Sequence, residues 1–283
     1  MKINNVEIIA NSKGKDSKKI VDELTKFLEE YNINFLVHYT YEFTQEVVLQ
    51  NGIDLLITIG GDGTVLYSAQ LAEKFGCPIL AINLGTFGYI TEISHDEWKD
   101  ALLQLMNGKG NLSSRLLLNT IVVRDGEVVY SKSSLNEAVI TSSGVSRIVY
   151  LDFFIDDTRA GAFKSDGVII ATPTGSTAYS LASGGPILYN DMKAFVITPV
   201  CPFTLSDRPI VLGLDHTVRI VVKSGQRTEV MLCIDGQSTF KLEESDEIIV
   251  GRSPSNIQLV SSDLRNYTQI IKNKLKWSGG LDT

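Results

Sequence analysis

Cysteine is scarce in this sequence, and its copies form neither a disulfide framework nor a metal-binding pattern. Cys77, Cys201 and Cys233 lie far apart in a chain of 283 residues, among apolar residues or beside proline. Secreted domains that depend on disulfides have many more cysteines at closer spacings. We therefore expect buried thiols in a cytoplasmic protein.

Long apolar runs and an excess of basic residues are absent as well. No run reaches the length of a membrane span, and the N-terminus shows no apolar core and cleavage site of a signal peptide. Asp and Glu number 33 against 26 Lys and Arg, so the formal net charge is −7. Because such a charge repels polyanions at long range, we expect neither a membrane nor a nucleic acid as partner.

The N-terminal part of the chain alternates short apolar runs with segments of helical period. The apolar runs are 6–10, 33–37, 54–59 and 78–82, and helical spacing is found at 20–31 and 96–106. Nearly continuous apolar strands are typical of a parallel sheet that is covered on both faces. We predict an α/β N-terminal domain with a Rossmann-like open parallel sheet.

From Leu116 onward, short β-rich runs follow one another without the helices that a parallel sheet requires. One pair is joined through Asp125-Gly126, a hairpin signal. We predict a mainly antiparallel β-sandwich C-terminal domain. Residues 267–277 return to helical spacing, so we assign 1–112 together with 264–283 to the α/β domain and 113–263 to the β-sandwich.

A glycine turn carries the first candidate site. Gly60-Gly61-Asp62-Gly63-Thr64 stands between an apolar strand and a helical segment. Glycines let backbone N–H groups approach an anion, and the helix N-terminus adds partial positive charge. Thr64 is the expected N-cap residue. A carboxylate at this place makes sense if it binds Mg²⁺ or accepts a proton from an attacking hydroxyl.

The alternative is a tight turn in which Asp62 merely caps the helix. For an isolated turn that alternative is favoured. The position at the carboxyl end of a strand in an open sheet, where ligands collect, favours a binding site instead. A Walker lysine and the spacing of a dinucleotide fingerprint are both absent.

A second candidate site is rich in hydroxyl groups. Lys164-Ser165-Asp166-Gly167 precedes an apolar run, and 172–179 has the sequence TPTGSTAY. Such groups can bind ribose, amide and phosphate oxygens, and Tyr179 can pack on a base. The alternative is a turn that caps a short helix at 178–182.

Asn136 and Glu137 are a third candidate pair. In a regular strand they would face opposite sides, so both can bind one ligand only at a strand end or in a loop. A solvated turn is an equally good interpretation of these two residues from the sequence alone.

Taken together, these residues resemble the NAD kinase family over nearly the whole chain. The matching motifs are 60–64, 83–89 (NLGTFGY), 136–137, 164–186, 207–209 (DRP) and 235–237 (DGQ). The resemblance implies that ATP, with Mg²⁺ or another divalent cation, phosphorylates the 2′-hydroxyl of the adenosine ribose of NAD to give NADP. Asp62 would accept the proton of that hydroxyl, and the β-sandwich domain would bind NAD.

The resemblance also implies the other binding residues and the assembly. NAD would be held by Asp62, Gly63, Tyr89, Asn136, Glu137, Arg147, Lys164, Asp166, Thr174, Thr177, Ala178, Tyr179, Ser180, Leu181, Ala182 and Gln237. The phosphates of ATP would lie on Gly60, Gly61, Gly63 and Thr64. Some NAD contacts would come from a neighbouring subunit, so a homodimer or homotetramer is expected.

One departure and two alternatives complete the interpretation. Phe203 stands where relatives often carry histidine, and phenylalanine has no polar group with which to replace imidazole. A diacylglycerol or sphingoid-base kinase shares the glycine turn, but the sequence offers no evident route for an acyl chain. A non-catalytic dinucleotide sensor would have little reason to keep a carboxylate beside phosphates.

Overall fold

The computed structural model describes residues 1–14, 16–41, 47–85, 88–144, 148–262 and 264–276. The chain forms two compact units: unit 1 contains Met1–Arg115 and Ile257–Thr283, and unit 2 contains Leu116–Asn256. From the sequence, the corresponding boundaries are predicted after 112 and after 263. Arg147, one of the predicted binding residues, and Thr86 and Phe87 of the 83–89 motif lie outside the described residues.

Unit 1 contains a parallel sheet with the strand order β5-β4-β3-β1-β2. The strands are β1 (Asn5–Asn11), β2 (Asn34–Thr40), β3 (Leu55–Gly60), β4 (Ile79–Asn83) and β5 (Ile93–Ser94). Every residue of β3 and β4 is buried, as expected for central strands of a sheet covered on both faces.

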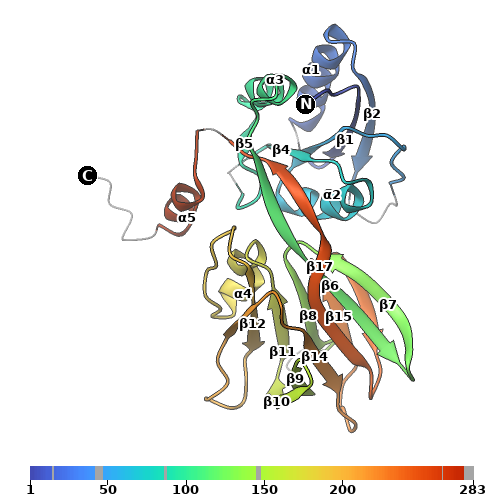
Figure 1. The fold of residues 1–283 in the computed structure, drawn as a ribbon, viewed down its shortest axis with the longest axis vertical. Helices are drawn as coiled ribbons and strands as arrows, with labels where there is room; N and C mark the ends of the chain where they lie inside the picture. The colour runs from blue at the N-terminus through green and yellow to red at the C-terminus, as the bar shows by residue number, and fades with distance from the viewer. Residues whose placement is uncertain (15, 42–46, 86–87, 145–147, 263, 277–283) are drawn as a thin grey trace. The chain divides into compact units, whose positions relative to one another are not determined.

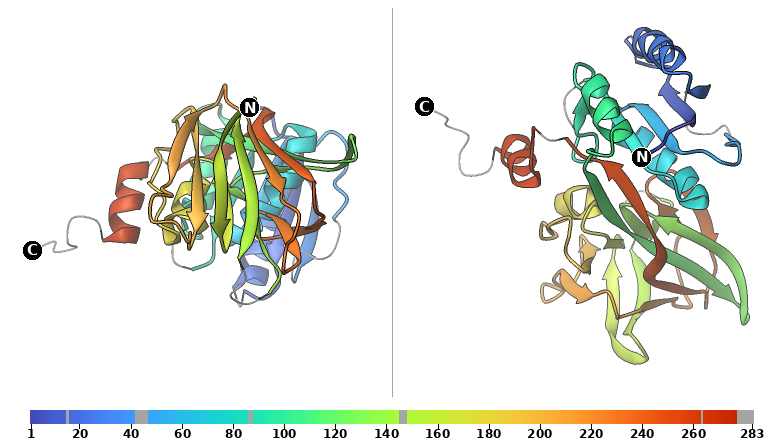
Figure 2. Two further views of the ribbon diagram at one scale, coloured as in Figure 1. Left: turned by 90° about the horizontal axis from the view of Figure 1, so that it is seen from below. Right: turned by 45° about the horizontal axis from the view of Figure 1, so that its top comes forward.

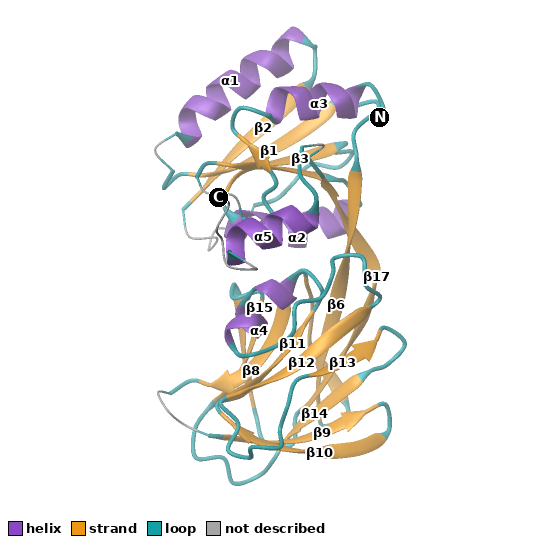
Figure 3. Ribbon diagram, turned by 90° about the vertical axis from the view of Figure 1, so that its left-hand side faces the viewer, coloured by secondary structure: helices purple, strands orange, loops and turns teal. Residues whose placement is uncertain are grey.

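Helices cover both faces of this sheet. Helices α1 (Ser17–Glu30) and α3 (Trp98–Met106) lie on one side of the strands and α2 (Asp62–Phe75) on the other (Figure 3). The ring of Phe27 on α1 meets that of Trp98 on α3 edge to face, with 5.5 Å between centroids. The crossovers β1-α1-β2 and β3-α2-β4 run in opposite directions along the sheet, which places a topological switch point between β1 and β3.

The C-terminal segment completes unit 1. The end of β17 (Glu247–Val260) pairs with β4 through Leu259 and Ile79. Helix α5 (Tyr267–Leu275) begins with a reciprocal capping box between Asn266 and Gln269. Within the described part of the chain, no helix is both long and apolar enough to cross a membrane.

Unit 2 is built from two sheets. The first is antiparallel, with the order β13-β12-β11-β8-β15-β16. Its strands are β8 (Glu137–Ser142), β11 (Gly167–Ala171), β12 (Ala194–Val200), β13 (Ile210–Gly213), β15 (Val230–Ile234) and β16 (Ser238–Leu242). A 3₁₀ turn, Gly175–Thr177, and a short helix, α4 (Tyr179–Ala182), follow β11.

The second sheet has the order β10-β9-β14-β17, and β6 pairs with both β17 and β7. Its further strands are β6 (Leu112–Arg124), β7 (Glu127–Ser134), β9 (Val149–Ile155), β10 (Thr158–Ser165) and β14 (Val218–Val222). The predicted hairpin is confirmed: β6 and β7, green in Figures 1 and 2, turn at Asp125-Gly126, both with positive φ. Strand β6 starts in unit 1 and ends in unit 2, and β17 runs the other way.

Alternating side chains of β8 and β11 separate two apolar layers. Ile140 and Val168 belong to the core between the sheets, whereas Val139 and Ile169 belong to a second cluster that also contains Leu188. Strand β11 is therefore buried on both faces, which explains its continuous apolar sequence. The predicted fold class, an α/β domain with an antiparallel β-sandwich, is confirmed.

Candidate active site

The glycine turn is where the sequence places it, but its first helical residue is Asp62. Gly60 closes β3 and Gly61 is the N-cap residue of α2. The prediction that Thr64 caps the helix is wrong, because the chain already turns into the helix at Gly61. Thr64 is buried in the first turn, and a Cβ added at Gly60 would lie 2.2 Å from its Oγ1. Gly60 therefore has no room for a side chain.

The carboxylate of Asp62 bonds to a distant segment of unit 1. Its Oδ2 accepts the N–H of Tyr89 at 2.9 Å, and its Oδ1 accepts the N–H groups of Ile90 and Thr91 at 3.3 and 3.1 Å. The hydroxyl of Thr91 donates to the same Oδ1 at 2.9 Å. Asp62 makes no capping bond to α2, so the interpretation of this residue as a simple helix cap is wrong.

The surroundings of Asp62 are those of a ligand site in an open α/β sheet. Gly60 and Asn83 pair across the carboxyl ends of β3 and β4, and the positive end of the α2 dipole points at the same place. Burial, followed by the negative charge of Asp62, raises the pKa of the half-buried Tyr89. Lys274 of α5 places its Nζ 5.8 Å from the centroid of that ring.

Ion pairs hold the segment that binds Asp62. The buried Arg115 donates from Nη2 to Glu92 Oε1 at 2.9 Å, and Arg265 donates from Nη1 to the Glu92 carbonyl at 2.8 Å. Arg265 is also paired with Glu97. Burial raises the pKa of Glu92 and lowers that of Arg115, so each charge depends on the other for compensation.

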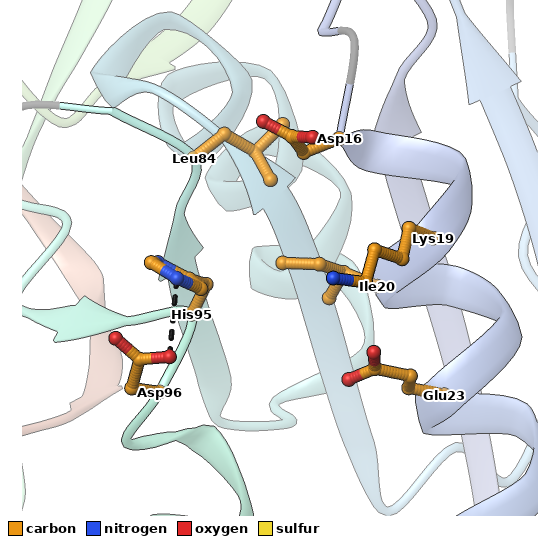
Figure 4. Close-up of a pocket in the computed structure, with 7 residues that line it drawn as sticks. All are labelled: Asp16, Lys19, Ile20, Glu23, Leu84, His95 and Asp96. Atoms are coloured by element: carbon orange, nitrogen blue, oxygen red, sulfur yellow. Dashed lines mark ion pairs between the residues drawn. The ribbon is translucent and has the colours of Figure 1, made fainter.

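A hollow of about 300 Å³ opens at the same edge of the sheet, beside α1 (Figure 4). It is lined by Asp16, Lys19, Ile20, Glu23, Leu84, His95 and Asp96. The predicted binding residues do not line it. His95 Nε2 and Asp96 Oδ1 form a pair at 3.1 Å. With three carboxylates around it, this hollow is poorly suited to phosphate groups.

In unit 2, Asn136 and Glu137 stand at the start of β8, a strand end as the sequence requires. Asp235, in the turn between β15 and β16, fixes their backbone. Its carboxylate accepts the N–H groups of Leu135, Asn136 and Glu137 at 2.9, 2.7 and 3.0 Å. Gln237 belongs to the same turn, so the 136–137 pair and the 235–237 motif form one structure.

Both side chains of this pair are buried and have a polar atom with unused hydrogen-bonding capacity among the described residues. Asn136 and Glu137 are 7% exposed, and neither Asn136 Oδ1 nor Glu137 Oε2 has a hydrogen-bond partner among the described residues. Burial, with a smaller contribution from the charge of Asp235, raises the pKa of Glu137 to about 8. Buried polar atoms of this kind usually have partners, so both atoms are available to a ligand.

The hydroxyl-rich segment packs against Asn136. Thr172 Oγ1 donates to the Leu135 carbonyl at 2.5 Å, and Thr172 N donates to that of Asn136 at 2.8 Å. Ser176 and Thr177 bond to backbone carbonyls of their own turn, and Ser180 bonds to Thr198. These hydroxyls do not cap α4, so that alternative is wrong; they shape the turn instead. Tyr179, which is 45% exposed, presents its ring to solvent.

Family models match both parts of the chain. Residues 30–110 match the ATP-NAD kinase N-terminal domain, and residues 135–262 match the ATP-NAD kinase C-terminal domain. The NAD kinase of Treponema denticola is 39% identical over 274 residues, which cover 97% of this chain and 96% of that protein. The chain belongs to the ATP-NAD kinase family. The NAD kinase of Aquifex aeolicus is 36% identical over 93% of this chain and 97% of its own length.

Solved structures of this kinase family have the same fold. Yeast NADH kinase, solved with NADH, gives a TM-score of 0.87 at 26% identity and covers 99% of this chain and 90% of its own. An Archaeoglobus fulgidus NAD kinase, solved with ATP, gives 0.77 at 18% identity, with 96% and 98% covered. A lipid kinase and a non-catalytic sensor are therefore not favoured.

The residues expected from the NAD kinase resemblance fall into two groups in unit 2. One group lies around Asn136 and Glu137, and the second contains Lys164 and Asp166. Strand β11 pairs Ala171 with Glu137 at one end and Gly167 with Thr141 at the other. Asp166 directly precedes Gly167, so it stands about 16 Å from Glu137 along the strand, the length of five extended residues, and Lys164 precedes it at the end of β10.

Phe203, the departure from the family pattern, belongs to the second group. The Nζ of Lys164 lies 4.0 Å from the centroid of the Phe203 ring, and Phe203 N donates to the Lys164 carbonyl at 2.8 Å. The ring is 69% exposed. A cation–π contact thus replaces the hydrogen bond that an imidazole could offer to a neighbour.

The sequence singles out Asp235 only as part of the 235–237 motif, without its contact to residues 135–137, and it does not single out Thr91. An Asp-Gly pair between two β-rich runs is a hairpin signal, and the positive φ of Asp235 agrees with it. That signal does not indicate that the Asp235 carboxylate accepts hydrogen bonds from residues almost 100 positions earlier in the chain. Thr91 had no signal at all.

Proposed function

We propose that this member of the ATP-NAD kinase family transfers the γ-phosphate of ATP to the 2′-hydroxyl of the adenosine ribose of NAD, giving NADP and ADP. The observation that carries the proposal is the carboxylate of Asp62, oriented by four hydrogen bonds at the carboxyl end of β3. Its place beside a glycine turn and a helix N-terminus suits a group that meets a hydroxyl next to a phosphate.

In this proposal the glycine turn and Asp62 have different roles. Gly60, Gly61, Gly63 and Thr64 bind the ATP phosphates through the backbone and the α2 dipole. Asp62 accepts the proton of the attacking hydroxyl. Because phosphoryl transfer passes through a loose transition state, positioning and neutralisation of charge supply most of the acceleration, and removal of the proton supplies less.

The dinucleotide is proposed to bind along two surfaces. The family resemblance implies that Tyr89, Asn136 and Glu137 bind the adenosine half. The remaining contacts are assigned to Arg147, Lys164, Asp166, Thr174, Thr177, Ala178, Tyr179, Ser180, Leu181, Ala182 and Gln237. Since the hydroxyls of Thr177 and Ser180 are already bonded, we assign the contacts of this segment to its backbone and to Tyr179.

A divalent cation is proposed to arrive with ATP. No group of three or more His, Cys, Asp or Glu side chains that could hold a metal is found among the described residues. Mg²⁺ therefore fits as a ligand of the ATP phosphates, where it neutralises charge.

A homodimer or homotetramer in the cytoplasm is the proposed working form. Lys164 and Asp166 stand at the opposite end of β11 from Glu137, which supports a site that draws one group from each of two subunits. The scarcity of cysteine and the unpaired Cys77, Cys201 and Cys233 suit a reducing compartment.

The direct test is an assay of the purified chain with NAD, ATP and Mg²⁺, in which NADP is measured. Asp62→Asn should lower kcat about 100-fold or more, because the hydroxyl loses its proton acceptor, while NAD still binds in a calorimetric titration. Asp100→Asn, on the exposed side of α3, is the matched control and should keep full activity.

Assays with other substrates show how a lack of NADP formation is to be interpreted. NADH and polyphosphate are assayed in parallel as acceptor and donor. Absence of NADP and NADPH with every donor would refute the enzyme, and phosphorylation of a diacylglycerol or a sphingoid base instead would assign the chain to the lipid kinases.

A further inference from the structure

Thr91 provides the sole side-chain hydrogen bond to Asp62 within the described part of unit 1. Thr91 is fully buried. We infer that Thr91, oriented by Asn83, is a positioning residue for phosphoryl transfer, and that Asp62 receives the acceptor hydroxyl at Oδ2. The inference rests on the proposed role of Asp62.

The direction of the Thr91 hydroxyl follows from its other partners. Its oxygen lies 2.8 Å from Asn83 Nδ2 and 3.0 Å from the N–H of Gly88, and both of these groups can only donate. They occupy the two lone pairs of Oγ1. The single hydroxyl proton of Thr91 must therefore point at Asp62 Oδ1.

Asn83 is itself held in one orientation. Its Oδ1 accepts the N–H of Gly85 at 2.7 Å, which leaves Nδ2 facing Thr91. Asn83 is buried at the end of β4. A chain of hydrogen bonds thus runs in one direction from Gly85 through Asn83 and Thr91 to the carboxylate of Asp62, and such chains rigidify the groups that they connect.

The two oxygens of Asp62 differ in what they can still accept. Oδ1 receives three donors, from Ile90 N, Thr91 N and Thr91 Oγ1, whereas Oδ2 receives only Tyr89 N. A carboxylate oxygen has two lone pairs in the plane of the group. Oδ2 is therefore the atom with a position open for the ribose hydroxyl.

The carboxylate of Asp62 occupies the space that a side chain at residue 88 would need. A Cβ added at Gly88 would lie 1.8 Å from Asp62 Oδ1 and 2.4 Å from Thr91 Oγ1. Asp62 can lie against this segment only because residue 88 is glycine.

The main test compares Thr91→Val with Thr91→Ser by steady-state kinetics. Thr91→Val keeps the shape of the side chain and removes the hydroxyl, so kcat should fall about 10- to 100-fold as Asp62 loses its alignment. The KM values for NAD and ATP should stay within about twofold, because the bound substrates keep their contacts. Thr91→Ser retains the hydroxyl and should recover most of kcat.

Two further variants separate positioning from general stability. Asn83→Ala leaves the Thr91 hydroxyl free to turn away from Asp62 and should lower kcat with the same split, even if Thr91→Val does not fold. Thr58→Val is the matched control: Thr58 is a fully buried threonine of β3 outside this network, and kcat should not change. Melting temperatures identify variants that are too unstable for assay.

Each outcome has one meaning. If Asp62→Asn is inactive while Thr91→Val and Asn83→Ala keep the wild-type kcat, the positioning role is refuted and the proposed function stands. An equal loss in Thr58→Val, or a Thr91→Ser enzyme as slow as Thr91→Val, also refutes it. If Asp62→Asn remains active, the catalytic role of Asp62 and this inference fall together.

Discussion

At the scale of single residues, Glu137 is the most unusual titratable group of unit 2. Burial is the main cause that raises its pKa from 4.5 to about 8, and the nearby charge of Asp235 adds to it. The carboxylate of Asp235 accepts three backbone N–H groups. Since the pKa of Glu137 is about 8, its carboxyl group is mainly protonated in the free protein near neutral pH.

This proton makes stability depend on pH. Between the unfolded pKa of 4.5 and the folded pKa of about 8, the folded chain holds a proton that the unfolded chain has lost. The free energy of unfolding therefore falls as pH rises through that window, by about 1.4 kcal/mol per pH unit at most. Calorimetric unfolding should show a lower Tm at pH 8 than at pH 6, and Glu137→Gln should flatten the slope.

The control for this prediction is Glu127→Gln, at an exposed position of β7. It removes a carboxylate without removing a buried one, so the slope should equal that of the wild type. A Glu137→Gln variant with an unchanged slope would show that Glu137 is ionised in the folded protein at neutral pH.

The sequence predicts those site residues that belong to a pattern of close neighbours in the chain. It does not predict contacts between residues that are far apart in the chain. Asp62 stands out because a glycine turn after an apolar strand is a local pattern. Its donors are backbone N–H groups 27 to 29 residues further on, and the sequence does not reveal which backbone groups come together. The binding role of Tyr89 or Gln237 rests on family resemblance and remains a prediction.

At the scale of elements, the turn that follows β11 is pressed against the start of β8. A Cβ added at Gly175 would lie 2.1 Å from the carbonyl oxygen of Asn136. Gly175→Ala must therefore push the 3₁₀ turn away from Asn136 and Glu137. We expect a KM for NAD at least about tenfold higher and a loss of about 1–3 kcal/mol of stability, measured by kinetics and by chemical unfolding.

Gly161→Ala is the matched control. Gly161 lies in β10, and an added Cβ there meets nothing within 4 Å. That variant should keep both the KM and the free energy of unfolding. A Gly175→Ala enzyme that binds NAD like the wild type would mean that the turn does not form the binding surface.

The strands show how far periodicity reaches. The apolar runs of the sequence predict strands at Val149–Ile155 and Gly167–Ala171, and β9 and β11 have these bounds. No such run predicts β10, because Thr158–Ser165 has a single large apolar residue, Phe163, and a bulge between Arg159 and Gly161. A further run predicts a strand from Glu247 to Val250, before Gly251 and Pro254, which usually interrupt a strand, yet β17 continues to Val260.

At the scale of the whole molecule, Glu137 and Asp166 lie near opposite ends of β11. This separation predicts that two subunits contribute residues to one site. If Glu137 of one chain and Asp166 of another form one site, a mixture of Glu137→Ala and Asp166→Ala chains contains some intact sites. Coexpression of the two inactive variants should restore roughly a quarter of the wild-type activity in a randomly mixed dimer. Coexpression of Lys164→Ala with Asp166→Ala should restore no activity. Both residues belong to the same group, so every site of a mixed dimer contains one of the two changes.

The result also tests the assembly itself. Size-exclusion chromatography with light scattering should give the mass of a dimer or tetramer for the active fraction. A monomeric protein with full activity, or no restoration in a verified mixed oligomer, would refute the shared site and would require each chain to bind NAD alone.

Unit 1 is assembled from two stretches of chain that are separated by the whole of unit 2, and this has a consequence for biosynthesis. Ile79 of β4 pairs with Leu259, and Glu97 with Arg265; both partners leave the ribosome after Leu116–Asn256 has been translated. At about 5–20 residues per second this delay is on the order of ten seconds. Until then part of the β4 edge is unpaired, a state in which nascent chains attract chaperones or one another. A segment that is translated after unit 2 thus completes a unit whose larger part is translated before it.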